Sequence, residues 1–287
     1  MKIYILNVDR RSQPERQGFV YPRHNRDFGV EQDFLNFLAR TRSSIAAKPD
    51  EADWHYLPIF WTRWHLNHDY AQQGIEELQQ IVDAALIDDA RTFTICQYDD
   101  GPLVNLGRTF QFLASRKTEV GLDIPLLCNQ HRKPWFNPKK RYLASFVGRL
   151  DTHPIRTDMA AAIQGRSDVS ILDGDLGTGA FVRRVLQSHL ALAPRGYGGS
   201  SFRFFEAMQL GVVPLLLGDI DTRPFKRFLP WEDASIYVKD VAQLNSLLDG
   251  IAKKDLIDMG KRAAVLYRDH LTYQNWCGYV IRELQGD

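Results

Sequence analysis

A short segment between residues 195 and 206 contains the groups best suited to chemistry. Three glycines, at 196, 198 and 199, are followed by two serines, an arginine and, three positions on, a glutamate. Such glycines permit positive φ and let a ligand approach the backbone, and a serine that opens a helix leaves N–H groups that attract anions. Arg203 suits a diphosphate, and Glu206 suits a ribose diol. The segment predicts a site for a phosphorylated small molecule, formed by Arg195, Gly196, Ser200, Ser201, Arg203 and Glu206.

A structural interpretation of Arg203 and Glu206 competes with this one. Residues three apart share one face of a helix, so the two side chains could form an ordinary surface ion pair after a flexible loop. The glycines, serines and strand ends around them favour the anion site.

Further candidates follow predicted strands. Gly148 and Arg149 come directly after a strand at 142–147, Arg195 follows one at 190–194, and Asp219 follows one at 214–218. Ligands of parallel sheets bind at the carboxyl ends of the strands. We therefore treat Arg149 and Arg195 as candidate phosphate ligands, with a solvated arginine as the alternative for each.

Asp99 and Asp100 are the candidate general bases. They follow the apolar run Thr92–Gln97 and precede Gly101-Pro102. A carboxylate at a strand end can take the proton from an attacking hydroxyl. Asp-Gly-Pro is also an ordinary turn, so the sequence leaves open both the role and which aspartate would have it.

The sequence predicts no metal site. Two Asp-x-Asp triplets, Asp173/Asp175 and Asp219/Asp221, could hold a metal–diphosphate bridge, but both stand at strand ends where aspartate is a common turn residue. The histidines lack a ligand spacing, and the three cysteines are unpaired in pattern.

Short β-rich runs alternate with stretches of helical period, which predicts an α/β protein with mainly parallel sheets. We expect strands near Lys2–Val8, Trp54–Phe60, Thr92–Gln97, Pro125–Cys128, Tyr142–Val147, Val169–Leu172, Leu190–Pro194 and Pro214–Gly218. We expect helices near Glu31–Ala39, Gly74–Leu86, Leu103–Leu113, Arg156–Gln164, Phe181–His189, Ser201–Leu210, Asp240–Ile251, Asp255–Asp269 and Tyr273–Leu284. An aromatic cluster at Trp61, Trp64, His65 and Tyr70 is either core or a sugar-stacking loop.

The segment from His131 to Arg141 interrupts this rhythm. It holds two prolines, a Trp-Phe pair and five lysines or arginines, without an apolar period. We interpret it as a connector between two domains, at 1–138 and 139–287, with the last helix (about 273–287) able to pack back on the first. Such a basic connector is either simply solvated or in contact with a phosphorylated or lipid-linked acceptor.

Composition restricts the class of protein further. The chain has 287 residues, 44% hydrophobic and 25% charged, with a net charge of +1. This composition is typical of a globular protein, and no overall field favours nucleic acid or an anionic membrane. No apolar run approaches the length of a membrane span.

Several of these residues together resemble the exostosin-like glycosyltransferases, glycosyltransferase family 47. The resemblance rests on Pro194-Arg195-Gly196, Ser200-Ser201-Phe202-Arg203-Phe204-Phe205-Glu206-Ala207, Gly211-Val212-Val213-Pro214, Pro224-Phe225 and Pro230-Trp231. Weaker matches are Phe146-x-Gly148, Ala52-Asp53 with Pro58, and Asp100-Gly101-Pro102.

The resemblance implies a GT-B fold, with two Rossmann-like domains that have parallel sheets facing a central cleft. The first would bind a glycan acceptor and the second a nucleotide sugar, of which a UDP-sugar is the first choice. Arg203 would hold the diphosphate, Glu206 the ribose, and Ser200 and Ser201 the phosphates. Transfer would invert the anomeric carbon, with no cofactor and no metal. The enzyme would act in surface polysaccharide or glycoconjugate synthesis.

Other expectations follow from the differences between this chain and the family pattern, and from the alternative classes of protein. Eukaryotic members of this family usually have a Golgi anchor and disulfides, and this chain shows neither, so we expect a cytoplasmic enzyme of bacterial or viral origin, with peripheral membrane contact left open. The rival class is a non-catalytic glycan- or nucleotide-binding protein of the same fold. A nicotinamide oxidoreductase is disfavoured, because no Gly-x-Gly-x-x-Gly follows Met1–Val8 or Tyr142–Val147.

Overall fold

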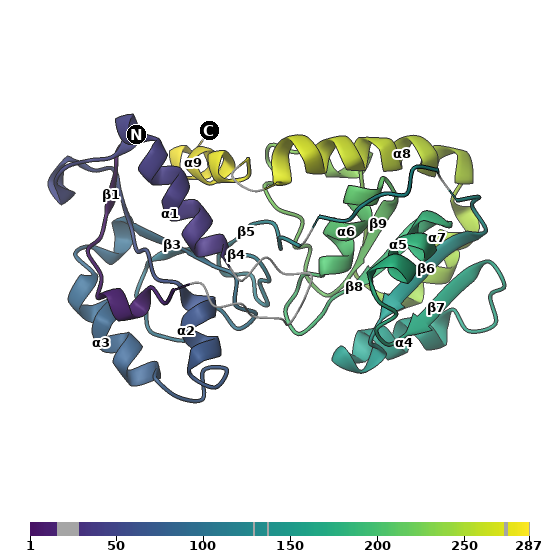
Figure 1. Cartoon of the computed structure of the whole chain (residues 1–287), viewed down its shortest axis with the longest axis horizontal. Helices are drawn as coiled ribbons and strands as arrows, with labels where there is room; N and C mark the ends of the chain where they lie inside the picture. The colour runs from purple at the N-terminus through teal and green to yellow at the C-terminus, as the bar shows by residue number, and fades with distance from the viewer. Residues whose placement is uncertain (16–28, 129, 137, 273–274, 287) are drawn as a thin grey trace. The chain divides into compact units, whose positions relative to one another are not determined.

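The computed structural model describes residues 1–287 except 16–28, 129, 137, 273–274 and 287. The chain divides into two compact units (Figure 1). Unit 1 comprises Met1–Leu127 together with Tyr273–Asp287, and unit 2 comprises Cys128–Thr272. The boundary expected after residue 138 is thus later than the one the contacts define, and the connector belongs to unit 2.

Unit 1 contains a sheet of five parallel strands in the order β1-β2-β3-β4-β5. The strands follow one another across the sheet in their order along the chain. They are β1 (Ile3–Ile5), β2 (Trp54–Tyr56), β3 (Thr92–Cys96), β4 (Phe110–Leu113) and β5 (Leu122–Asp123). All five residues of β3 are buried, as expected for a central strand covered on both faces.

The core of unit 1 has an aromatic cluster around Phe34 and a second, mixed apolar cluster. Phe34 of α1 (Val30–Arg40) packs on Tyr56, on Phe93 and on Trp276 beside α9 (Cys277–Gln285). The mixed apolar cluster joins α3 (Ile75–Ala85) to α2 (Trp61–Asn67). It contains Leu78, Ile81 and Val82 of α3 with Trp61 and Trp64 of α2. Trp54 Nε1 donates to the Leu284 carbonyl at 3.2 Å, which ties α9 to β2.

Unit 2 contains a second sheet of five parallel strands, in the order β10-β9-β8-β6-β7. In this sheet β6, the first strand of unit 2, lies inside the sheet. The strand β7 pairs on one side of it, and β8, β9 and β10 follow on the other side. The strands are β6 (Tyr142–Gly148), β7 (Val169–Asp173), β8 (Ser188–Pro194), β9 (Val213–Leu217) and β10 (Ile236–Val238).

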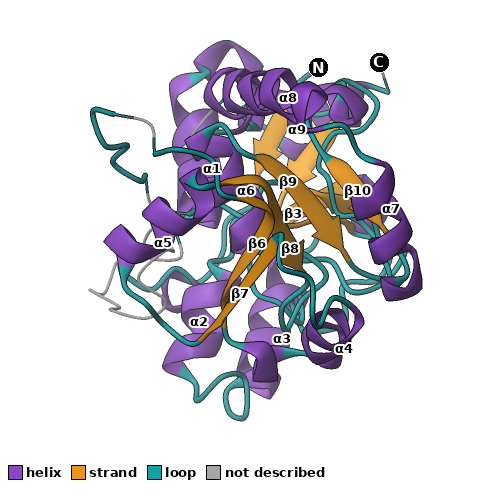
Figure 2. Ribbon diagram, turned by 90° about the vertical axis from the view of Figure 1, so that its right-hand side faces the viewer, coloured by secondary structure: helices purple, strands orange, loops and turns teal. Residues whose placement is uncertain are grey.

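Helices cover both faces of this sheet (Figure 2). On one face, α5 (Thr178–Leu186) and α6 (Phe202–Leu210) pack on Val147 and Ala191. On the other, α4 (Pro154–Ala162) and α7 (Leu244–Gly250) pack on alternate strand residues such as Leu190 and Leu215. The remaining helix is α8 (Lys253–Leu266), which a π turn (Tyr267–Leu271) extends. The predicted fold class, α/β with two Rossmann-like domains of parallel strands, is confirmed.

The errors in the expected elements fall mainly in unit 1. The expected helix at Leu103–Leu113 is wrong, because 110–113 forms β4, in which Phe112 is buried while Phe110 is exposed. The expected strand at Pro125–Cys128 is wrong as well: the paired residues are Leu122–Asp123, and a proline has no N–H for a ladder.

Other differences concern short elements and helix ends. The aromatic run after β2 forms the helix α2, with Trp61 and Trp64 in the core rather than in a sugar-stacking loop. The three-residue edge strand β10 was not predicted. The helix expected at Tyr273–Leu284 corresponds to α9, and its residues 273–274 lie outside the described residues.

Candidate functional site

The strand order of unit 2 reverses between β6 and β8. The connections after these two neighbouring strands run to opposite sides, so their carboxyl ends border a crevice where open α/β sheets bind ligands. Gly148 ends β6, and Arg195 and Gly196 follow β8. The sequence candidates Gly148, Arg149, Arg195 and Gly196 are therefore brought to one edge of one sheet.

Arg203, in the first turn of α6, reaches the same edge. A Cβ atom placed on Gly148 would lie 3.5 Å from Arg203 Nε, so the guanidinium lies directly against the end of β6. It also lies over the Phe181 ring, at 4.5 Å from the centroid. The side chain of Arg203 is 24% exposed, so it is both fixed in place and open to a ligand.

Arg156 joins these residues, although no motif or spacing in the sequence indicates it. Its guanidinium donates to the carbonyls of Arg195 at 2.9 Å and of Arg149 at 2.9 Å, so it bridges the ends of β8 and β6. Burial, and then the nearby Arg203, lower the pKa of Arg156 to about 10. Among the described residues no carboxylate forms an ion pair with it. The strand ends thus carry positive charge that an anion can neutralise.

Arg195 has a different environment from the one expected. Its guanidinium forms an ion pair with Asp219, and its Nε donates to the Gly198 carbonyl at 3.1 Å. Arg195 is buried, whereas the Asp219 side chain is 58% exposed. The pair therefore shapes the loop after β8. Arg149, by contrast, is exposed beside it.

Ser201 is the N-cap residue of α6, yet its hydroxyl makes no capping hydrogen bond. The side chain is buried and its Oγ has no hydrogen-bond partner, which costs free energy that a ligand oxygen could restore. The first-turn N–H groups of a helix also lack intrahelical partners. Ser200 is buried next to it, and its carbonyl accepts from the Gly196 N–H at 3.1 Å.

The loop glycines do not adopt the conformation expected of them. Among the described residues, those with positive φ do not include Gly196, Gly198 or Gly199. Gly196 lies against Arg156, since a Cβ placed on it would lie 3.4 Å from Arg156 Nη2.

Glu206 is paired on both sides rather than open to solvent. Its Oε2 accepts from Arg203 Nη1 at 2.7 Å, and its Oε1 accepts from His131 Nε2 at 2.8 Å. The Glu206 side chain is 1% exposed, so the Arg203–Glu206 pair is not the surface pair of the structural interpretation. His131 was not among the predicted site residues, because nothing in the sequence places the connector beside α6.

The aspartate candidates lie in unit 1, in the turn after β3. Asp100 is 48% exposed and forms an ion pair with Lys117, and Asp99 is half-buried. His65 of α2 borders this turn, with Nε2 donating to the Pro102 carbonyl at 3.0 Å. Burial lowers the pKa of His65 to about 4, so this imidazole is neutral near pH 7.

A buried carboxyl group that the sequence analysis did not single out lies close to the same strand end. Glu31, in the first turn of α1, accepts from the N–H of Gln97, the residue after β3, at 3.1 Å, and from Thr62 Oγ1 at 2.8 Å. Its Oε2 is buried without a hydrogen-bond partner, and burial raises the pKa of Glu31. The group joins the starts of α1 and α2 to the end of β3.

The Asp-x-Asp triplets have structural roles. Asp173 accepts from the Leu150 N–H at 2.9 Å, Asp175 accepts from the Gly177 N–H at 2.9 Å, and Asp221 pairs with Arg223. In the part of the chain that the structure describes, no three His, Cys, Asp or Glu side chains form a group that could hold a metal ion. The expectation of transfer without a metal stays a prediction.

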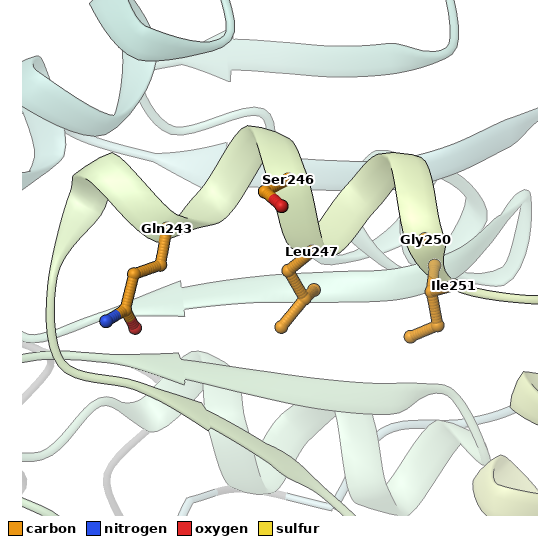
Figure 3. Close-up of a pocket in the computed structure, with 5 residues that line it drawn as sticks. All are labelled: Gln243, Ser246, Leu247, Gly250 and Ile251. Carbon is orange, nitrogen blue, oxygen red and sulfur yellow. The ribbon is translucent and has the colours of Figure 1, made fainter.

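A hollow of about 500 Å³ lies along α7, lined by Gln243, Ser246, Leu247, Gly250 and Ile251 (Figure 3). It carries no charged side chain and shares no residue with the arginine-rich strand ends. It offers no cation for a diphosphate, so we do not place the site there.

Comparison with known proteins adds a family. The model of the Exostosin GT47 domain matches residues 1–251. A probable glucuronosyltransferase of rice (Oryza sativa subsp. japonica) is 31% identical over 190 residues, 58% of this chain and 42% of that protein. Exostosin-1 of Drosophila melanogaster is 30% identical over 82 residues, 28% of this chain and 11% of that protein. The chain thus matches less than half the length of these relatives.

These relatives correct one expectation. The matches include proteins of rice, fruit fly, the nematode Caenorhabditis elegans and Arabidopsis thaliana, so the prediction of a cytoplasmic enzyme of bacterial or viral origin is wrong. Among the described residues, no helix combines the length and the apolar character needed to cross a membrane.

Similarity to solved structures is distant. The glycosyltransferase AviGT4 of avilamycin A biosynthesis aligns over 100% of this chain and 98% of its own, with 13% identity and a TM-score of 0.41. A sucrose-phosphate synthase of Thermosynechococcus elongatus aligns over 88% and 71%, with 12% identity and a TM-score of 0.42. The family model, which covers most of the chain, gives the assignment: the protein belongs to the Exostosin GT47 family.

Proposed function

We propose that the protein is an inverting glycosyltransferase that moves a sugar from a nucleotide-diphosphate sugar to a hydroxyl group of a glycan, in polysaccharide or glycoconjugate synthesis. One observation carries the proposal: the arginines at the reversal of strand order in unit 2, with the unpartnered Ser201 hydroxyl beside them. Several relatives are named as glucuronosyl- or xylosyltransferases, which supports the reaction class.

In this proposal unit 2 binds the donor. Arg203 and the N-terminus of α6 hold the diphosphate, Ser201 donates its hydroxyl to a phosphate oxygen, and Arg149 closes the exposed side. Arg156 adds positive charge from within the fold, while Arg195 with Asp219 positions the loop. Negative charge grows on the departing diphosphate in the transition state, where fixed cations stabilise it most. UDP is the nucleotide that we expect, and no metal is required.

Unit 1 binds the acceptor and supplies the base in this proposal. Asp99 or Asp100 takes the proton from the acceptor hydroxyl as its oxygen bonds to the anomeric carbon. The bond from that carbon to the phosphate oxygen breaks in the same step, and the nucleoside diphosphate leaves. Asp100 forms an ion pair with Lys117.

Calorimetric titration with UDP, GDP, ADP and CDP tests the donor site without knowledge of the sugar or the acceptor. We expect one of them to bind, with UDP the first choice. Arg203→Ala removes charge-assisted hydrogen bonds to phosphate and should weaken binding about 10- to 100-fold. Arg166→Ala is the matched control, because Arg166 lies before β7, at the amino end of the sheet, and pairs with Asp168 and Asp249.

The controls separate the outcomes. If none of the four diphosphates binds, the donor site is not where we place it. If Arg166→Ala weakens binding as much as Arg203→Ala, the effect is general and the proposal fails. Binding that depends on Arg203, without donor hydrolysis or transfer for any nucleotide sugar, would favour the non-catalytic binding protein.

A further inference from the structure

The carboxylate of Glu206 is covered by protein groups on both of its oxygens. His131 donates to Oε1 at 2.8 Å and Arg203 donates to Oε2 at 2.7 Å. The carboxylate can only accept, so the His131 nitrogen at this contact carries the proton. The side chain of Glu206 is 1% exposed and that of His131 is 7% exposed. A ligand hydroxyl therefore cannot reach Glu206 unless a group that covers the carboxylate, such as His131 or Arg203, moves.

The two partners differ in how they are held. Arg203 belongs to the same helix as Glu206, three residues earlier, and lies over the Phe181 ring at 4.5 Å. His131 comes from the connector and belongs to no helix or strand. Its backbone N–H donates to Gln209 Oε1 at 2.9 Å, so α6 anchors the backbone while the imidazole can rotate about its own side-chain bonds.

We propose that His131 is a specificity-determining residue of the donor site, whose imidazole occupies the place on Glu206 that a ribose hydroxyl takes when the donor binds. This inference rests on the proposed function, because it requires a nucleotide with its ribose at Glu206. Binding then exchanges one hydrogen bond to Glu206 for another. The displaced imidazole remains tethered beside the site through the Gln209 contact.

The exchange has a measurable consequence. In the wild-type protein a ribose hydroxyl adds little affinity, because the His131 bond is lost when the ribose bond forms. Without the imidazole N–H, the ribose hydroxyl can bond to Glu206 Oε1 without breaking the His131 hydrogen bond first. A hydrogen bond to a charged group then adds about 10-fold to the affinity. A nucleotide without ribose hydroxyls gains nothing.

The test compares two ligands on four proteins. The ligands are the nucleoside diphosphate that binds most tightly in the calorimetric screen and its 2′,3′-dideoxy form. The proteins are the wild type, His131→Phe, His131→Gln and His189→Phe. Phenylalanine keeps a ring against Phe181, which His131 now faces at 5.3 Å, but cannot donate. Glutamine restores an N–H donor. His189→Phe is the matched control, since His189 lies near the amino end of β8.

We expect His131→Phe to bind the natural diphosphate about 10-fold more tightly and the dideoxy form unchanged, with His131→Gln and His189→Phe close to the wild type. Equal changes for both ligands in His131→Phe would overturn the inference, because His131 would then only support the fold. Weaker binding of the ribose form alone would also overturn it, because His131 would then hold Glu206 ready for the ribose. Failure of the proposed function is distinguishable: no diphosphate would bind the wild-type protein.

Discussion

The two sheets that the structure describes have the same number of parallel strands and opposite charges at their carboxyl ends. In unit 2 the ends of β6 and β8 are surrounded by Arg149, Arg156, Arg195 and Arg203. In unit 1 the end of β3 is followed by Asp99 and Asp100, beside a histidine that stays neutral near pH 7. The strand order reverses in unit 2, whereas in unit 1 it runs in sequence.

In the proposed function, this difference keeps the base away from the arginines. A carboxylate placed among the arginines of unit 2 would pair with one of them, as Asp219 does with Arg195 and Glu206 with Arg203. In the proposed reaction, a carboxylate paired in this way would not be free to take the proton of an acceptor hydroxyl. Four predictions test this contrast, beginning with the largest expected effect.

Replacing the aspartates of unit 1 should abolish turnover without affecting the nucleotide. For whichever of Asp99→Asn and Asp100→Asn removes the base, we expect kcat to fall about 10²- to 10⁴-fold with unchanged nucleoside diphosphate affinity. The measurement is donor turnover alongside calorimetry, with Asp83→Asn on α3 as the control. Loss of nucleotide affinity in either variant would contradict the proposal that unit 1 supplies the base and unit 2 binds the nucleotide.

Replacing Arg156 should lower the stability of unit 2. Arg156→Met removes the guanidinium hydrogen bonds to the carbonyls of Arg149 and Arg195, so we expect the free energy of unfolding to fall by about 2 kcal/mol. Urea unfolding measures this, with Arg183→Met, an exposed position on α5, as the control. Unchanged stability combined with lost nucleotide affinity would mean that Arg156 is a direct ligand instead.

His65 should make unit 1 sensitive to acid. In the unfolded chain its imidazole takes up a proton near pH 6.5, but in the folded protein only near pH 4. Between these values the unfolded state binds more protons, so the stabilisation is complete above pH 6.5 and decreases as the pH falls. We expect the free energy of unfolding to lose about 1 kcal/mol from pH 7.5 to 5.5, and His65→Gln to remove that part of the slope. An identical slope in the variant would show that His65 is not the titrating group.

Ser201 should give the smallest effect, with opposite signs for stability and binding. Ser201→Ala removes a buried hydroxyl that has no partner, which should raise the free energy of unfolding by about 1 kcal/mol. The same change should weaken nucleoside diphosphate binding about 3- to 10-fold, because a phosphate contact is lost. Thermal unfolding and calorimetry measure the two, with the exposed Ser246→Ala as the control. A loss in stability would mean that the hydroxyl caps α6 after all.

The sequence predicts unit 2 well because its signals are local. Glycine, serine and alternating apolar residues mark where β6, β8 and α6 end or begin. Parallel pairing then brings Gly148 and Arg195 to one edge, and α6 starts in the loop that follows β8. The prediction fails where contacts join distant residues. The hydrogen bonds of Arg156, and the contact between His131 and Glu206, depend on side-chain positions that no spacing encodes.

Unit 1 is harder to predict because its strands are short. Phe110–Leu113 has too few residues to separate a period of two from a helical stripe, and the buried Pro125–Cys128 is apolar without joining a ladder. Glu31 was missed for a related reason: a glutamate at the start of a helix is normally solvated. Only the packing of α1 against the end of β3 buries it.

The division of the chain also sets an order of assembly. Unit 2 is one uninterrupted stretch, Cys128–Thr272, whereas unit 1 needs the residues on either side of it. During synthesis, every residue of unit 2 leaves the ribosome before Trp276, which completes the aromatic cluster around Phe34. The earlier-made part of unit 1 therefore has to wait, with one apolar face uncovered, until the last helix arrives. Unit 1, whose synthesis begins first, is therefore the unit that completes its folding last.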